Sequence, residues 1–362
     1  MKKFSPSSAS GVALIMVMIA VFALSVLVGA FAYAMKVETK LAQNANNDET
    51  LIWLGRSGVE LARWVLAEQM TVPGEPYDSL NQKWAGGPGS INASNSPLAS
   101  VSLENYRIGD GTVTVKITDL ERKININTVQ EPLLQKALES MGVDAGDIPV
   151  VTDSILDWMD PNSNPNVTRV NGAKSDYYQS LDPSYAAKNG PIDDLSELLL
   201  IRGVTQDMYW GTASTNHTAA FFQKVDRLGR PFQTPVYSAG LVDIFTPISR
   251  GSKININTAS AIVLQAIPGV DQNIADQIIK MRSGPDGADG TEDDTPLMNV
   301  GEVINAGVSP QAIPQIQQFC DVRSYTFEVR VDAEIGGTRK TFFAIVGRNS
   351  ARDLPVLGFY WK

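Results

Sequence analysis

The longest hydrophobic run in the chain lies close to its N-terminus. No charged residue and no proline occurs in the 24 residues from Val12 to Met35, whereas Met1–Ser10 is polar and contains Lys2 and Lys3. At roughly 1.5 Å per helical residue, this run exceeds the roughly 30 Å hydrocarbon core of a bilayer. An ordinary signal peptide has a shorter apolar region with its cleavage site after it. The pattern therefore predicts a membrane-spanning helix, with the basic leader in the cytoplasm and the bulk of the chain beyond the membrane.

Beyond the apolar run, hydrophobic positions recur in steps of three and four. Such positions share one face of a helix, and here they are Leu51, Leu54, Gly58, Leu61 and Val65. No proline occurs between Val12 and Val72, and Pro73 ends this stretch. The sequence thus predicts one continuous helix that is lipid-embedded in its first half and amphipathic in its second. We expect Trp53 and Trp64 to cover a sheet, with a partner helix as the alternative contact for one of them.

Alternating hydrophobic and polar positions occur in two places that are far apart in the sequence. The first is a hairpin of residues 106–108 and 112–117, joined by Gly-Asp-Gly, because such turns and period-two alternation are typical of antiparallel strands. The second is the C-terminus, with strands expected at Tyr325–Ala333, Lys340–Val346 and Leu357–Trp361. Most of the intervening sequence has helical patterns. We therefore predict an α+β fold, in which a long N-terminal helix packs on an antiparallel sheet that a large helical insertion interrupts.

The predicted insertion contains an internal repeat. Lys123–Thr128 reads K-I-N-I-N-T, and the same six letters recur at Lys253–Thr258. Further along each copy, Leu195–Val204 and Val300–Val308 are again similar. Alternating Ile and Asn suits a short extended segment, and the threonine is a favourable N-cap for a following helix. A six-residue identity is improbable by chance, so we infer that the insertion arose by duplication.

The second copy carries the pattern of a helix-hairpin-helix or SAM-like element. Its hairpin reads L-Q-A-I-P-G-V at Leu264–Val270. DNA-binding versions of this motif have G-x-G followed by a basic residue, so that amides and a helix N-terminus hold a phosphate. Asp271 and Gln272 stand at those positions here. Because a carboxylate repels phosphate, the pattern indicates the fold but argues against nucleic-acid binding.

These patterns divide the chain into six segments. The boundaries follow from the glycine that ends the leader, the end of the apolar run, the two starts of the repeat and the first C-terminal strand. The segments are a leader at 1–11, a transmembrane half-helix at 12–35, the first part of the sheet domain at 36–122, insertion copies at 123–250 and 251–320, and C-terminal strands at 321–362.

Composition narrows the classes of function. The formal net charge of −9 disfavours a general binder of nucleic acid or anionic membranes, which needs a cationic face. The single cysteine, Cys320, cannot form an internal disulfide, and the single histidine, His217, removes most hydrolytic triads and multi-histidine zinc sites. We expect Cys320 to be a small buried residue and His217 to lie in a surface loop. No phosphate-binding loop or nucleophile elbow occurs, so we expect no enzyme.

A polar leader ending in glycine, followed by a long apolar helix that continues into an amphipathic one, resembles type IV pilins and pseudopilins. The resemblance implies that a prepilin peptidase cuts after Gly11 and methylates the new N-terminus at Val12. Most pilins carry glutamate at the fifth mature position, whereas this position is Met16. A carboxylate in hydrocarbon costs several kcal/mol unless it is paired, and in the family it is thought to pair with the terminal amine of the subunit ahead. A subunit without it is therefore expected at the tip of an assembly.

Together with the repeat and the helix-hairpin-helix pattern, the missing glutamate resembles the type II secretion system protein K family of minor pseudopilins. The resemblance extends from the leader to the final strand and implies a pilin-like domain. It further implies a non-enzymatic, single-pass protein of the bacterial inner membrane with its globular domain in the periplasm. The implied partners are the minor pseudopilins called proteins I and J, the major pseudopilin and the prepilin peptidase, with no nucleic acid. The alternative is a membrane-anchored helix-hairpin-helix DNA receptor of a competence system.

Two acidic clusters are candidate calcium sites, because calcium needs hard oxygen ligands on a turning backbone. The loop at 283–296 is similar to the glycine-aspartate calcium loop of the major pseudopilins, and its carboxylates are Asp286, Asp289, Glu292, Asp293 and Asp294. The other cluster combines residues at helical spacing with one later aspartate, and consists of Asp153, Asp157, Asp160 and Asp176. The protein K resemblance implies calcium in the helical domain. For both clusters the alternative is a solvated acidic surface.

Overall fold

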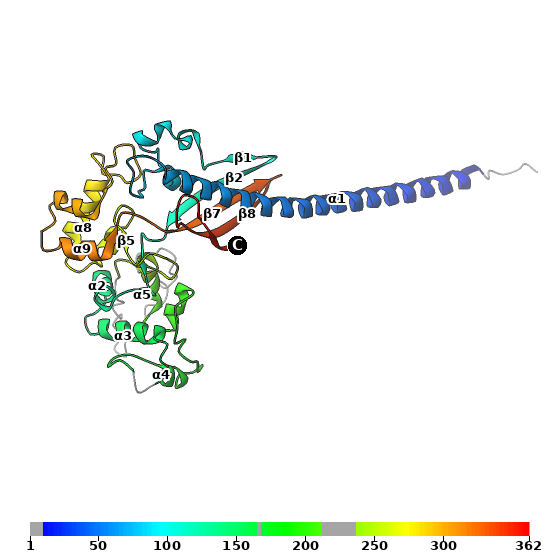
Figure 1. The fold of residues 1–362 in the computed structure, drawn as a ribbon. Helices are drawn as coiled ribbons and strands as arrows, with labels where there is room; N and C mark the ends of the chain where they lie inside the picture. The colour runs from blue at the N-terminus through cyan, green and yellow to red at the C-terminus, as the bar shows by residue number, and fades with distance from the viewer. Residues whose placement is uncertain (1–9, 165–167, 212–236, 362) are drawn as a thin grey trace, which may run out of the picture.

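One helix of 60 residues, α1 (Ser10–Gln69), dominates the molecule. The computed structural model describes residues 10–164, 168–211 and 237–361, so the leader residues 1–9 and His217 lie outside the described residues. The first half of α1 projects from the globular part as a bare rod (Figure 1). All side chains of residues 12–42 are exposed, and this helix is long and apolar enough to cross a membrane. The prediction of one continuous helix is confirmed.

The second half of α1 packs on the sheet. Leu51, Leu54 and Val65 are buried as predicted. Two glycines on the same face allow the close approach: a Cβ added at Gly55 would lie 2.5 Å from Phe342 Cδ2, and one at Gly58 would lie 2.4 Å from a methyl carbon of Val331. Only a residue without a side chain fits at either position.

The sheet is antiparallel, with the order β1-β2-β7-β8-β9. Its strands are β1 (Tyr106–Ile108), β2 (Gly111–Asp119), β7 (Thr326–Ile335), β8 (Thr338–Gly347) and β9 (Val356–Trp361). The pattern of strands expected from sequence is confirmed: β1 has the predicted bounds, and the other strands differ from theirs by one or two residues at an end. β2 pairs along its length with β7, although the whole insertion separates them in sequence. Figure 1 shows α1 lying across one face of this sheet.

The tryptophans differ from the expectation. Trp53 is 63% exposed and Trp64 is 38% exposed, because both lie on the face of α1 that points away from the sheet. The tryptophan that covers the core is Trp84, which packs edge-on against Phe327 with 5.3 Å between ring centroids. Trp84 belongs to the short 3-10 helix η1 (Lys83–Ala85), which is followed by η2 (Ile91–Asn95) and η3 (Pro97–Ser100). These turns lie between the end of α1 and the start of β1.

The insertion forms a separate head with its own hydrophobic core at the end of the sheet. The described elements of its first copy are β3 (Ile124–Asn125), α2 (Glu131–Met141), α3 (Ile148–Met159), α4 (Ser175–Gln179), η5 (Leu195–Leu200), α5 (Gln206–Trp210), α6 (Leu241–Ile244) and β4 (Phe245–Thr246). Those of the second copy are β5 (Ile254–Asn255), α7 (Ala261–Gln265), α8 (Gln272–Arg282), η7 (Val300–Ala306), α9 (Ile313–Phe319) and β6 (Cys320–Asp321). The described part of the insertion is thus helical apart from two short strand pairs.

The repeated K-I-N-I-N-T segment has the same structure in both copies. Each copy places its first Ile-Asn pair in a two-residue parallel pairing with the strand that closes the copy, β3 with β4 and β5 with β6. The first asparagine then accepts the backbone N–H of the second, at 2.9 Å for Asn127 N to Asn125 Oδ1 and 3.0 Å for Asn257 N to Asn255 Oδ1.

The second asparagine of each repeat holds a later loop by a two-way exchange of hydrogen bonds. The Asn127 amide donates to Ile192 O and accepts from Ile192 N, at 2.9 and 2.7 Å. The Asn257 amide makes the same exchange with Leu297, at 2.9 Å in each direction. The two partners also occupy equivalent places, each three residues before a 3-10 helix. The duplication inferred from six letters is therefore visible in the geometry.

Candidate assembly surfaces and cation sites

The rod of α1 ends at the residues predicted to be processed. Gly11 and Val12 lie in the first turn of the helix. Met16, which would be the fifth residue after the predicted cleavage, is exposed and uncharged. A helix of this length that is apolar on every side needs lipid or other apolar helices to cover it, because contact with water is unfavourable for its side chains. The rod is therefore a surface for a membrane and for neighbouring helices.

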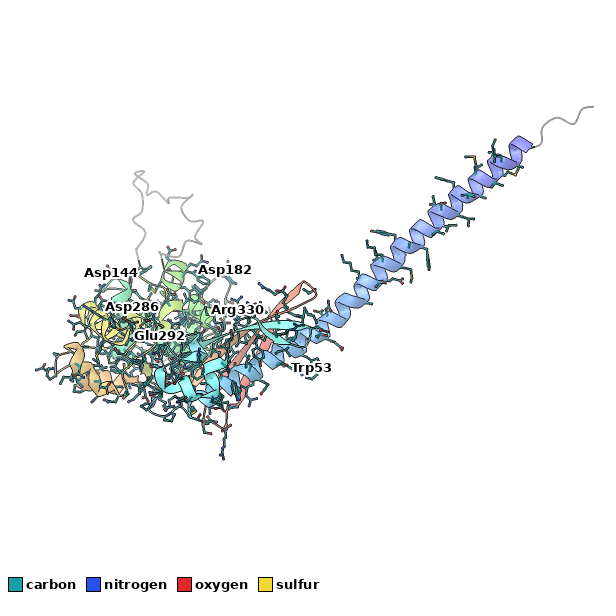
Figure 2. All side chains as sticks on the ribbon, turned by 90° about the horizontal axis from the view of Figure 1, so that it is seen from above. Trp53, Asp144, Asp182, Asp286, Glu292 and Arg330 are labelled. Atoms are coloured by element: carbon teal, nitrogen blue, oxygen red, sulfur yellow. The ribbon has the colours of Figure 1, made fainter. Side chains whose placement is uncertain are left out.

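A second candidate surface is the back of α1 beside the head. Trp53 and Trp64 are eleven residues apart, which is about three helical turns, so their side chains lie along one line. The Arg56 guanidinium stacks over the Trp53 ring at 5.1 Å from its centroid, and Arg63 is paired with Glu60 at 2.6 Å. Figure 2 shows Trp53 at the point where the rod joins the globular part. Two exposed indoles in a charged setting are typical of protein interfaces.

The acidic cluster of the first insertion copy already contains a cation. The ammonium of Lys174, whose side chain is 0% exposed, lies 2.9 Å from Asp160 Oδ2 and also donates to the carbonyl of Asn162. The hydrogen bond from Lys174 lowers the pKa of Asp160. Asp157 is buried, accepts Arg169 N at 3.1 Å and has a pKa raised by burial.

The two remaining members of this cluster differ in setting. Asp153 accepts Asn171 N at 3.0 Å, whereas Asp176 is exposed in the first turn of α4. Lysine thus supplies positive charge at the place where calcium was predicted.

The acidic loop of the second copy, at 283–296, is bonded to itself. Asp289 takes two hydrogen bonds from Arg282, at 3.1 and 2.7 Å. Asp293 Oδ2 accepts Asp286 N at 3.0 Å, and Asp294 Oδ2 accepts Gly290 N at 2.8 Å. Asp286 and Glu292 lie on the surface of the head (Figure 2).

The donor types of this loop fit calcium, since five carboxylates share one turning segment. Across the described residues, however, no three acidic, histidine or cysteine side chains converge as metal ligands. The calcium sites therefore stay predictions.

The phosphate position of the helix-hairpin-helix element is occupied by a carboxylate. Ile267 and Val270 are buried in the hairpin between α7 and α8. The Asp271 carboxylate caps α8, accepting Ile274 N at 2.8 Å. The position at which DNA-binding versions hold a phosphate thus carries a negative charge that is already bonded to the helix, as the sequence indicated.

Sequence reasoning missed a buried polar junction between sheet and head. Glu121 follows β2 and is fully buried, and both its oxygens are occupied: Oε2 accepts Tyr325 N and Thr326 N at 3.1 and 2.9 Å, and Oε1 accepts Gly251 N at 3.1 Å. One carboxylate therefore joins the first strand segment to both returning segments. The only signal in the sequence was its place two residues before the start of the first repeat.

Asp119 lies beside Glu121 in the same junction. Its Oδ2 accepts Thr258 Oγ1 at 2.5 Å and Asn255 Nδ2 at 3.2 Å, so the second repeat is bonded directly to the end of β2. Burial raises the pKa of Asp119 to about 7, and the Glu121 charge adds to the rise, while the hydrogen bond from Thr258 opposes it. Asp78 completes the junction through a buried ion pair with Arg348.

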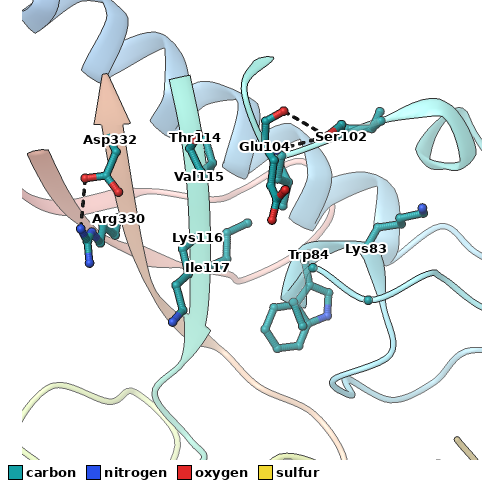
Figure 3. Close-up of a pocket in the computed structure, with 15 residues that line it drawn as sticks. Lys83, Trp84, Ser102, Glu104, Thr114, Val115, Lys116, Ile117, Arg330 and Asp332 are labelled. Carbon is teal, nitrogen blue, oxygen red and sulfur yellow. Dashed lines mark hydrogen bonds and ion pairs between the residues drawn. The ribbon is translucent and has the colours of Figure 1, made fainter. Parts of the chain in front are cut away.

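A hollow of about 750 Å³ lies over β2 (Figure 3). Lys83, Glu104 and Lys116 line it, and so do Arg330 and Asp332, which are paired at 3.2 Å. None of its described lining residues is a cysteine or histidine.

Cys320 is buried as expected, and burial raises the pKa of its thiol to about 12.

Comparisons with known proteins agree with this architecture. The family described as "Type II secretion system (T2SS), protein K" matches residues 115–212, and a helix-hairpin-helix motif matches residues 249–285. Type II secretion system protein K of Aeromonas hydrophila is 22% identical over 96% of this chain and 95% of its own length. That of Pseudomonas aeruginosa is 22% identical over 79% of this chain and 76% of its own length.

A solved structure has the same fold. It is the GspK-GspI-GspJ complex of the enterotoxigenic Escherichia coli type 2 secretion system, in which the matching chain has a TM-score of 0.60 at 17% identity, covering 89% of this chain and 99% of that one. A long helix packed on an antiparallel sheet, with a helical head between the strands, defines a pilin-like protein with an inserted domain. In sequence over most of its length, and in fold, the chain is similar to proteins described as type II secretion system protein K.

Proposed function

We propose that this protein is a minor pseudopilin at the tip of the type II secretion pseudopilus, where it initiates or caps assembly for the export of folded proteins across the outer membrane. The observation that carries the proposal is the α1 rod, whose apolar side chains are exposed on all sides while its other half is fixed to a folded head. The rod places the protein in the inner membrane as a single-pass subunit with its head in the periplasm. There it packs with similar helices of other subunits.

A place at the tip is supported by two features. Met16 leaves the fifth mature position without the carboxylate that would pair with the amine of a subunit ahead. The head adds bulk at the end of the sheet (Figure 1), and a subunit at the apex does not have to fit this bulk within a stacked fibre. The work of the subunit is assembly, and none of its described pockets needs to perform catalysis.

The proposed partners are proteins I and J, the counterparts of GspI and GspJ in the matching solved complex. The back of α1, with Trp53 and Trp64, is the surface that we assign to this contact. The major pseudopilin follows below the tip, and the prepilin peptidase processes the chain between Gly11 and Val12.

Co-purification of the full chain with proteins I and J from detergent extracts tests this function. Changing Trp53→Ala together with Trp64→Ala should reduce recovery of the partners at least tenfold, because buried tryptophans at interfaces often contribute about 2 kcal/mol or more. Trp210→Ala is the control, since Trp210 is also exposed but lies on the head. Wild-type chain that recovers neither partner would overturn the proposed function, and equal losses in both variants would overturn the assignment of this surface.

Calcium binding by the second-copy loop is a further part of the proposal. Asp293→Ala with Asp294→Ala should lower the melting temperature more in calcium than in chelator, because the variant loses ligands as well as hydrogen bonds to the loop. Asp110→Ala, in an exposed turn of the sheet, controls for the loss of surface charge. Equal shifts with and without calcium would remove this site from the proposal.

A further inference from the structure

A pocket of about 500 Å³ lies where the end of the sheet meets the second insertion copy. Three segments line it, at 250–253, 321–325 and 348–349. Its ionisable side chains are strongly biased in sign: Arg250, Lys253, Arg323 and Arg348 line it with one carboxylate, Asp321. Such a concentration of cations is unusual on a chain with a formal net charge of −9.

Neutral acceptors hold the three outer cations in place. Arg250 Nη1 donates to Asn349 Oδ1 at 2.7 Å, Lys253 Nζ donates to Gln317 O at 2.9 Å, and Arg323 Nε donates to Pro76 O at 2.7 Å. These bonds fix the side chains without neutralising them. Among the described residues, no carboxylate forms an ion pair with any of the three.

The fourth cation is buried. The Arg348 side chain is 1% exposed and is paired with Asp78, yet its Nη1 has no hydrogen-bond partner among the described residues. The Glu121 carboxylate lies behind the lining, where it accepts backbone N–H groups, including that of Gly251. Asp321 and Glu121 together offset two of the three outer cations, so one positive charge remains in excess.

Apolar and aromatic groups surround these charges. Tyr325 lines the pocket and is exposed. Ile248, two residues before Arg250 in the sequence, is also exposed. The exposed Leu357 and Arg250 both lie against Gly347, since a Cβ added there would be 3.4 Å from Leu357 Cδ1 and 2.9 Å from Arg250 Nη1. Arginine and tyrosine beside exposed aliphatic side chains are enriched at protein interfaces, whereas a site for a free inorganic anion needs no apolar surround.

The position of the pocket excludes a lipid headgroup. Arg323 is bonded to the carbonyl of Pro76, just beyond the C-terminal end of α1. The part of α1 outside the apolar run, residues 36–69, spans about 50 Å at the rise of an α-helix. The pocket is therefore far from the bilayer.

We propose that this pocket binds an acidic segment of a partner protein, with two or more carboxylates of that segment paired with Arg250, Lys253 and Arg323. The inference rests on the charges and the apolar surround of the pocket, and it holds whether or not the protein occupies the tip. Charge-assisted pairs of this kind make binding sensitive to salt.

Titration of the full chain in a neutral detergent with a labelled hexaglutamate peptide tests the proposal. We expect saturable binding that weakens as salt is raised. Arg250→Gln with Lys253→Gln should weaken it at least tenfold, whereas Arg107→Gln with Lys136→Gln, which removes the same charges from other surfaces, should change it less than twofold. Ser252→Glu, which removes no hydrogen bond of the described residues and places a carboxylate in the lining, should also abolish binding.

Three results would overturn the proposal. The first is no binding of hexaglutamate at millimolar concentration to the wild-type chain. The second is an equal loss in the control variant, which would show non-specific attraction. The third is binding of inorganic phosphate without any binding of the peptide, which would make the pocket a small-anion site.

Discussion

Single side chains join the two parts of this molecule. Asn255 belongs to the repeat that builds the head, yet its amide donates to the Asp78 carbonyl, to Asp119 and to Ser324 Oγ, at 3.1, 3.2 and 2.7 Å. Its counterpart Asn125 instead donates to Ser249 O within its own copy, at 2.8 Å. The duplicated asparagine therefore keeps its local role in both copies, and only the second copy uses it to bond the head to the sheet.

Asp119 makes this junction sensitive to pH. Its pKa is raised from 3.8 to about 7 in the folded protein, so the native state holds the proton more tightly than the unfolded chain. The stability from this group is complete below about pH 4 and is lost as pH rises through about 7. Between pH 5 and 7.5 we expect the melting temperature to fall, with the free energy of unfolding changing by up to about 1.4 kcal/mol per pH unit.

Asp119→Asn should flatten this dependence, because the amide has no proton to lose in that range. Thermal unfolding of both proteins at several pH values checks the prediction. The difference between the two slopes isolates Asp119 from other titrating groups. Parallel slopes would show that the Asp119 proton is not linked to folding.

At the scale of elements, α1 combines two kinds of helix in one. Its first half is apolar on every side, whereas its second half has a buried face that includes two glycines. The glycines are needed because β7 and β8 lie against the helix backbone: the Gly58 position leaves only 2.4 Å between an added Cβ and Val331. Val331 is itself fully buried in the centre of the sheet.

Gly58→Ala should therefore destabilise the protein by up to about 2 kcal/mol. Overpacking of a core costs about 1–3 kcal/mol, from which the roughly 1 kcal/mol that alanine gains over glycine in a helix is subtracted. Gly29→Ala is the matched control in the rod, where an added Cβ meets nothing within 4 Å. Thermal unfolding in detergent compares the two, and a Gly58→Ala protein as stable as the control would contradict the packing described here.

Local sequence patterns predicted most of these elements. The strands and the long helix were predicted from the periodicity of hydrophobic residues, which is a property of neighbouring positions. The repeat was predicted from two identical stretches of sequence. The prediction that Trp53 and Trp64 cover the sheet was wrong. It relied on the usual burial of large aromatic residues, whereas only the packing of α1 shows which face meets the sheet.

The candidate site was less predictable from sequence than the fold. Glu121 bonds to Thr326, 205 residues away, and Arg348 bonds to Asp78, 270 residues away, and no local pattern marks such contacts. Lys174 was missed for the same reason, since only the folded loop brings its ammonium to Asp160. The acidic residues were found by composition, but composition does not show which of them are already paired.

At the scale of the whole molecule, the proposed place at the tip makes Met16 informative. Met16→Glu places a carboxylate in hydrocarbon, which costs several kcal/mol unless a neighbouring amine pairs with it. At the tip no subunit lies ahead, so secretion into the medium should fall several-fold in cells that rely on the variant. Met16→Leu should secrete normally. Normal secretion by Met16→Glu would indicate that a subunit ahead supplies the amine, and it would exclude the tip.

The pairing of β2 with β7 has a consequence for biogenesis. Leu120 N donates to Thr326 O at 3.0 Å, so the head leaves and re-enters the sheet at adjacent points. If the N-terminal anchor enters the membrane first, β7, β8 and β9 are exported after the head. The head is then able to fold while α1 and the first hairpin still wait for their partners. The pilin-like half of the molecule is thus completed only after the head has crossed the membrane, and its bare β2 edge needs protection until that moment.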